Sequence, residues 1–122
     1  MSADATTSAS RATQADVFLD AALDHMAAGN PQQAIPVLQD ALALDPQDNA
    51  ATHALLRALE DTGRLDEALA LTRDRIAADP DDALAHTRLS ILLQRMGDIP
   101  AAEAAAARAK ILGWKRQLKD GA

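Results

Sequence analysis

Histidine and acidic residues are the side chains of this protein that could hold a metal ion or transfer a proton near neutral pH. The three histidines are His25, His53 and His86, and only Asp82, four residues before His86, stands at a helical spacing from one of them. A single carboxylate–imidazole pair supplies too few ligands for a metal site. It is more typical of a surface ion pair or a helix cap.

Covalent catalysis and phosphate binding also lack the residues that they need. The chain has no cysteine, and its five glycines are isolated from one another, so it has no thiol nucleophile and no glycine-rich phosphate loop. A serine nucleophile needs an adjacent base, and no such arrangement surrounds Ser2, Ser8, Ser10 or Ser90. The sequence therefore predicts a protein that is not an enzyme and that has no cofactor and no metal.

The sequence does contain residues suited to binding a ligand, because arginines recur at a helical spacing. Arg88 and Arg95 are seven residues apart, which places them on one face of a helix. A guanidinium fork suits carboxylates, so these residues and Arg57 predict an acidic ligand. In the alternative interpretation the arginines only solvate the surface or pair with Glu60 and Asp61.

The elements that position these side chains recur every 34 residues. Glycine ends a helix in the left-handed conformation, alanine lets two helices approach closely, and proline cannot continue a helix. These residue types share the spacing, as Gly29, Gly63 and Gly97, as Ala34, Ala68 and Ala102, and as Asp-Pro at 45–46 and 79–80. We expect helices at about 15–28, 31–44, 49–62, 65–78, 83–96 and 99–112.

Composition agrees with an all-α protein. Hydrophobic residues make up 48% of the chain and aromatic residues only 2%, so most of the apolar content is alanine and leucine, which favour helices.

No apolar run is long enough to cross a bilayer, so we expect no membrane insertion. Residues 1–13 are small and polar and do not form a secretory signal; we expect a disordered tail and a cytoplasmic protein. The alternative is an alanine-rich bundle with accidental glycine spacing.

The repeating unit resembles the tetratricopeptide repeat, whose period is also 34 residues. The resemblance covers three repeats, 15–48, 49–82 and 83–116, in a domain of residues 14–116 followed by a C-terminal extension, 117–122. It implies a right-handed α-solenoid of three antiparallel helix pairs that serves as a protein-binding scaffold or adaptor. The sequence departs from the family where Arg75 replaces a small residue and Trp114 replaces proline. His25 and His86 replace aromatic residues, which implies partly buried packing roles.

The resemblance also implies a binding surface, because the first helix of each repeat lines a concave groove in this family. The side chains carried over to that groove are Leu19, Leu23, His53, Arg57, Leu84, Arg88, Ile91 and Arg95. The partner implied is a protein or peptide with apolar residues and an acidic or C-terminal carboxylate. Some members clamp the C-terminal carboxylates of heat-shock chaperones, but of the five clamp positions here, occupied by Leu19, Leu23, Ala54, Leu84 and Arg88, only the last matches.

Charge is unevenly distributed along the chain. The net charge is −6, with −6 on residues 1–48 and +4 on residues 83–122. Overall acidity argues against nucleic-acid binding, which favours a basic face. The gradient would favour head-to-tail contact between copies, so the alternative function is a self-assembling structural protein or homo-oligomer. A further alternative is an accessory subunit of an enzyme or assembly complex.

The C-terminal segment contains an apolar stripe. Ile111, Trp114 and Leu118 follow one another at steps of three and four residues. The end of a repeat array needs a cover, and the favoured interpretation is that this stripe helps to cover it, with the helix continuing past Gly113 at a cost of ~1 kcal/mol. In the alternative interpretation the stripe is an interface with another molecule.

Overall fold

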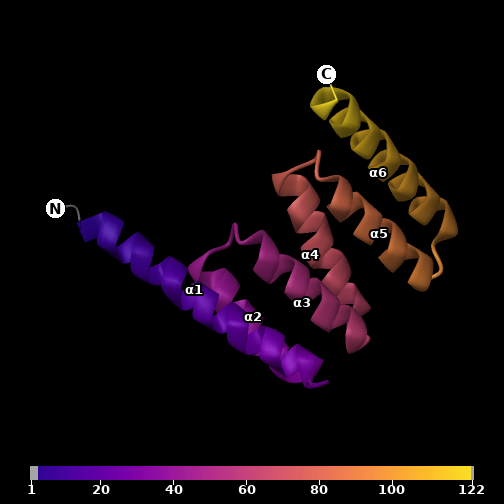
Figure 1. Ribbon diagram of the computed structural model, residues 1–122. Helices are drawn as coiled ribbons and strands as arrows, with labels where there is room; N and C mark the ends of the chain where they lie inside the picture. Colours follow the sequence, from indigo (N-terminus) through magenta and orange to yellow (C-terminus); the bar gives the residue numbers. More distant parts are fainter. Residues whose placement is uncertain (1–2, 122) are drawn as a thin grey trace. The chain divides into compact units, whose positions relative to one another are not determined.

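The computed structural model describes residues 3–121, with side chains from Thr13 onward, and the residues that it describes form six helices and no strand (Figure 1). The predicted all-α class is confirmed. The helices are α1 (Ala3–Ala27), α2 (Pro31–Leu44), α3 (Asn49–Asp61), α4 (Leu65–Ala78), α5 (Ala83–Arg95) and α6 (Ile99–Asp120). They fall into two compact units, Met1–Arg64 with α1 to α3 and Leu65–Ala122 with α4 to α6.

Glycine turns join the first helix of each repeat to the second. Gly29, Gly63 and Gly97 have φ angles of 81°, 75° and 88°, in the left-handed region that favours glycine. After α3, the Gly63 N–H donates to the Glu60 carbonyl at 3.1 Å and the Arg64 N–H donates to the Leu59 carbonyl at 2.8 Å. This pair of bonds is a Schellman motif, which satisfies carbonyls that the end of the helix leaves open.

Two Asp-Pro turns join one repeat to the next, and they have the same hydrogen bonds. In the first, the Asp45 carboxylate accepts from the Gln47 N–H at 3.2 Å, and the Asp48 carboxylate accepts from the Ala51 N–H at 3.1 Å as the N-cap of α3. In the second, 34 residues on, Asp79 accepts from Asp81 at 3.2 Å and Asp82 from Ala85 at 3.1 Å. The recurring sequence signal is therefore a turn followed by a helix cap.

Small side chains lie at the centre of the first unit. The α2 helix packs against α1 and α3. Ala22 on α1 and Ala34 and Ala41 on α2 are fully buried, together with the larger Leu38. Because alanine adds little bulk beyond the backbone, neighbouring helices can approach closely here, and leucine and isoleucine fill the remaining space.

The second unit follows the same design. The α5 helix packs against α4 and α6, with Ala85 and Leu92 on α5 and Ala102 and Ala105 on α6 all buried. The Ser90 hydroxyl on α5 donates to the Ala102 carbonyl of α6 at 2.7 Å. This hydrogen bond links the two helices of the last repeat at a position where both side chains are small.

The first helix differs from the prediction at its start. It begins at Ala3 rather than near residue 15, so most of the expected disordered tail, residues 1–13, is helical. Residues 1–2 of that tail lie outside the described residues. The N-terminal turns of α1 extend past α2 (Figure 1). Adding a residue to an existing helix avoids the cost of nucleation, so a short polar segment rich in alanine can continue α1 without tertiary contacts.

Replacement of glycine by alanine should have opposite effects on stability in a glycine turn and inside α6. Gly63→Ala should lower the free energy of unfolding by about 1–2 kcal/mol, because alanine is strained at positive φ. Gly113 lies inside α6, and a Cβ atom there would meet nothing within 4 Å. Gly113→Ala should therefore stabilise the protein by up to ~1 kcal/mol. Urea denaturation of both variants measures this, and a neutral Gly63→Ala would contradict the left-handed turn.

The segment 1–13 should contribute nothing to stability, as the sequence predicts. Residues 3–14 include no apolar side chain larger than alanine, so they cannot bury much surface against the rest of the unit. Deleting residues 1–13 should leave the melting temperature unchanged in a circular dichroism scan. Deleting residues 1–22 is the control and should lower it, because that deletion removes the buried Ala15 and Ala22. A lower melting temperature for the shorter deletion would show that the segment packs.

Candidate peptide-binding surface

Four of the predicted groove residues form a row on α5. Leu84, Arg88, Ile91 and Arg95 are separated by four, three and four residues, so they share one face of the helix. Leu84 is 56% exposed and Ile91 is 47% exposed. Arg95 is exposed and Arg88 is half-buried. Apolar and cationic groups thus alternate along about three turns.

The other four predicted residues lie in the first unit, as two on α1 and two on α3. Leu19 is half-buried and Leu23, one turn later, is 46% exposed. On α3, His53 is half-buried and Arg57 is exposed. Each pair has a four-residue step, so each occupies a single helix face. Leu23 and Arg57 are the more accessible members.

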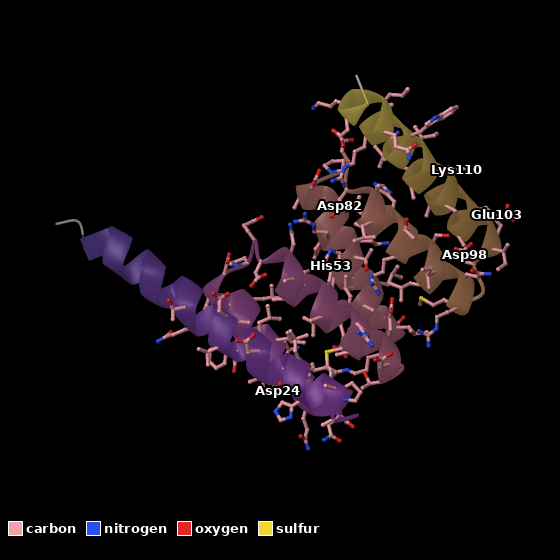
Figure 2. All side chains as sticks on the ribbon, viewed as in Figure 1. Asp24, His53, Asp82, Asp98, Glu103 and Lys110 are labelled. Carbon is pink, nitrogen blue, oxygen red and sulfur yellow. The ribbon has the colours of Figure 1, made fainter. Side chains whose placement is uncertain are left out.

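Hydrogen bonds fix the start of α5 and therefore its row. Asp82 is the N-cap, as Figure 2 shows at the beginning of the helix, and its second carboxylate oxygen lies 2.9 Å from Nε of Arg75 on α4. The His86 ring nitrogen Nε2 lies 2.8 Å from the carbonyl oxygen of Pro80. Asp82 is thus a cap, and His86 is a buried packing residue, as the sequence predicted for both.

The favoured interpretation of the C-terminal stripe is wrong. Trp114 and Leu118 are each 68% exposed and Ile111 is 45% exposed, so these side chains do not cover the end of the unit. The buried residues of α6 are Ala102, Ala105 and Leu112 instead. The helix does continue through Gly113, to Asp120, and its last turns extend past α5 (Figure 1).

The described residues contain no cluster of three or more histidine or acidic side chains placed to bind a metal ion. Within the same part of the chain, no helix is long and apolar enough to cross a bilayer.

A sequence profile of the tetratricopeptide repeat matches residues 25–87, just over half of the chain. The protein belongs to the tetratricopeptide repeat family. This is a family of protein-interaction modules, and six helices agree with three of its repeats. No curated protein sequence matches the chain.

Solved structures show the same tetratricopeptide repeat fold. YrrB, described as a TPR protein with an unusual peptide-binding site, has a TM-score of 0.74 and 24% identity over 81% of this chain, which spans only 51% of YrrB. SycD, a type III secretion translocator chaperone of Yersinia enterocolitica, has a TM-score of 0.74 and 19% identity, covering 82% of this chain and 76% of SycD. PcrH, solved with the chaperone binding region of PopB, has a TM-score of 0.73 and 18% identity, covering 92% and 83%.

Two contacts of this tetratricopeptide repeat protein were missed by sequence reasoning. Arg75 stands where the family has a small residue, and it joins the last turn of α4 to Asp82 and, at 3.9 Å, to Asp79. Its seven-residue distance from Asp82 gives no local helical signal. The sequence indicated only that Ser90 lacks an adjacent base, although its hydroxyl makes the bond to α6.

The Arg75–Asp82 contact can be separated from the cap by a matched comparison. Asp48 is an equivalent cap without an arginine, because Ala41 occupies the position that corresponds to Arg75. Asp48→Ala should lose about 1 kcal/mol of unfolding free energy, and Asp82→Ala should lose more. In an Arg75→Ala background the cost of Asp82→Ala should fall to that of Asp48→Ala. Equal costs in both backgrounds would show that the arginine contributes nothing.

Proposed function

We propose that this protein is a non-enzymatic adaptor that binds a segment of a partner protein on the exposed face of α5. Carboxylates of the segment pair with Arg88 and Arg95, and its apolar side chains pack on Leu84 and Ile91. The single observation that supports this proposal is that the exposed apolar residues Leu84 and Ile91 alternate with the half-buried Arg88 and the exposed Arg95 along one helix face.

The two kinds of contact have different roles. An exposed arginine–carboxylate pair contributes about 1 kcal/mol or less and is weakened by salt. Full burial of a leucine or isoleucine side chain contributes about 1.5–3 kcal/mol. Leu84 and Ile91 therefore supply most of the affinity, while the arginines select an acidic segment and set its register.

The first unit offers the same chemistry on a smaller scale. Leu23 on α1 is an exposed apolar side chain, and Arg57 on α3 is an exposed cation. Neither residue needs to move to become accessible. We therefore include the α1 and α3 residues, Leu19, Leu23, His53 and Arg57, in the proposed binding surface of this unit.

The solved relatives support a peptide-like partner. YrrB is described as having a peptide-binding site, and PcrH is solved with a binding region of another protein, PopB. A helical repeat surface gives an extended chain room to contact several side chains, so affinity can accumulate from individually weak contacts. The acidic character of the segment rests on this chain's own arginines.

The proposal is tested by selecting displayed random peptides on the full chain and measuring the affinity of labelled, selected peptides by fluorescence anisotropy. We expect peptides with acidic groups beside apolar residues, bound more tightly at low salt. Arg95→Glu should weaken their binding about tenfold or more, because attraction becomes repulsion. Arg95 is preferred to the half-buried Arg88 because its side chain is exposed.

Arg116→Glu is the matched control. It makes the same charge change on α6, at a side chain that is 82% exposed and whose one ion pair among the described residues is with Asp120, at 3.8 Å. Its binding should equal that of the unaltered chain. Equal losses of affinity in the two variants would show that the effect arises from net charge alone. Enrichment of neutral or basic peptides would contradict the proposal.

A further inference from the structure

The outer face of α6 is an apolar seam with alternating steps of three and four residues. Such spacing is the a/d pattern of a coiled coil, which is narrower than the apolar face of an ordinary surface helix. All five side chains are exposed, and they are Ala104, Ala107, Ile111, Trp114 and Leu118. The seam is about 21 Å long at 1.5 Å per residue.

The seam points away from the rest of the second unit. Ala105 and Leu112, which are buried, each follow a seam residue by one position and lie toward the opposite side of the helix. Beside Trp114 the surface is hollowed, and this hollow is lined by Ala107, Lys110, Gly113 and Gln117 together with Ile111 and Trp114. Gly113 lies on the flank of the helix rather than in the seam, so this hollow lies beside the indole, next to Lys110 and Gln117.

Basic residues flank the seam at the e and g positions, whose charges determine which helix can pair in a coiled coil. Arg108 and Lys115 follow seam residues on one side, and Lys110 precedes one on the other. Glu103 is the one acidic residue at such a flanking position, near the start of the helix. Arg108 lies 4.0 Å from Asp81, whereas Lys110 and Lys115 make no ion pair within the described residues.

We propose that this seam binds an acidic amphipathic helix of another protein. That helix carries apolar residues at three- and four-residue steps, which pack against Ile111, Trp114 and Leu118. Aspartate or glutamate residues flank its apolar stripe and meet Lys110 and Lys115. This surface shares no residue with the α5 row of the proposed function, although Ile91 and Lys110 line one hollow between α5 and α6, and it does not depend on that function.

Charge argues against a second copy of the chain as the occupant. If α6 paired with itself in parallel, repulsion between Lys110 of one copy and Lys115 of the other would offset the attraction between Glu103 and Arg108, and an antiparallel pair would oppose basic residues. The α1 helix is acidic, but its exposed Asp16, Asp20 and Asp24 follow one another at steps of four with no apolar seam between them. Its large exposed apolar side chains, Val17 and Leu23, are six residues apart and do not form a seam with three- and four-residue steps for Trp114 to pack against.

Trp114 is the only tryptophan of the chain and reports directly on the seam. The probe is a synthetic helix with leucine at its a and d positions and glutamate at e and g, and a second probe has lysine in place of glutamate. Adding the glutamate peptide to the full chain should shift Trp114 emission to shorter wavelength, and the lysine peptide should not. Titration of this shift gives the dissociation constant of each peptide.

Charge reversal tests the recognition itself. Lys110→Glu with Lys115→Glu should weaken binding of the glutamate peptide about tenfold or more and create binding of the lysine peptide. Arg116→Glu, on the side of α6 opposite the seam, should change neither. Leu118→Ser should weaken binding of the glutamate peptide to the otherwise unaltered chain and of the lysine peptide to the Lys110→Glu, Lys115→Glu variant. Circular dichroism of each variant checks folding, and because all these side chains are exposed, the helical signal should be kept.

Several results would overturn this inference. One is the absence of a shift with the glutamate peptide, and another is equal binding of both peptides. A shift with concentration alone would identify a second copy as the occupant, and a shift seen only with anionic phospholipid vesicles would identify a membrane surface. Arg95→Glu should leave the seam's affinity unchanged, so failure here and failure of the proposed function are distinguishable.

Discussion

Close approach between neighbouring helices is the constraint on which the rest of this structure depends. With a single tryptophan, a single phenylalanine and no tyrosine, the chain cannot fill wide gaps between helices. Ala22, Ala34 and Ala41 in the first unit and Ala102 in the second are buried almost completely, where a larger side chain would push two backbones apart. The glycine turns make the approach possible, because they reverse the chain within a few residues.

This dependence on local signals explains why the fold was predictable from the sequence. Glycine at positive φ and aspartate at a helix N-terminus each act within about one helical turn, so their 34-residue repetition gives the helix order directly. Contacts that join residues farther apart have no such signal. Arg75 reaches Asp82 across a turn, and Ser90 reaches α6 across 12 residues. For the site, the shared face of Arg88 and Arg95 followed from spacing, whereas the exposure of Trp114 required the structure.

The exposed surfaces of α5 and α6 differ in how they could select a ligand. On α5, arginines stand within the same row as the apolar residues, so a bound segment must present its acidic and apolar groups alternately. On α6, the apolar residues form a continuous seam and the charges lie at its sides. The first arrangement suits an irregular or extended segment, and the second suits a helix, whose side chains repeat at the same steps. The two surfaces therefore favour different partner classes, although they adjoin where Ile91 and Lys110 line one hollow.

The local sequence of α6 supports the view that its last turns serve binding rather than stability. Gly113 costs about 1 kcal/mol inside a helix relative to alanine, and a large apolar residue at positions 114 and 118 gains little from folding when it is 68% exposed. An alanine at 113 and polar residues at 114 and 118 would keep the helix and improve its solubility. The large side chains at 114 and 118 make sense together in a docking seam, and the glycine leaves a hollow beside Trp114 that Ile111 and Lys110 also line. A residue pattern that is unfavourable for the isolated chain is then favourable for the complex.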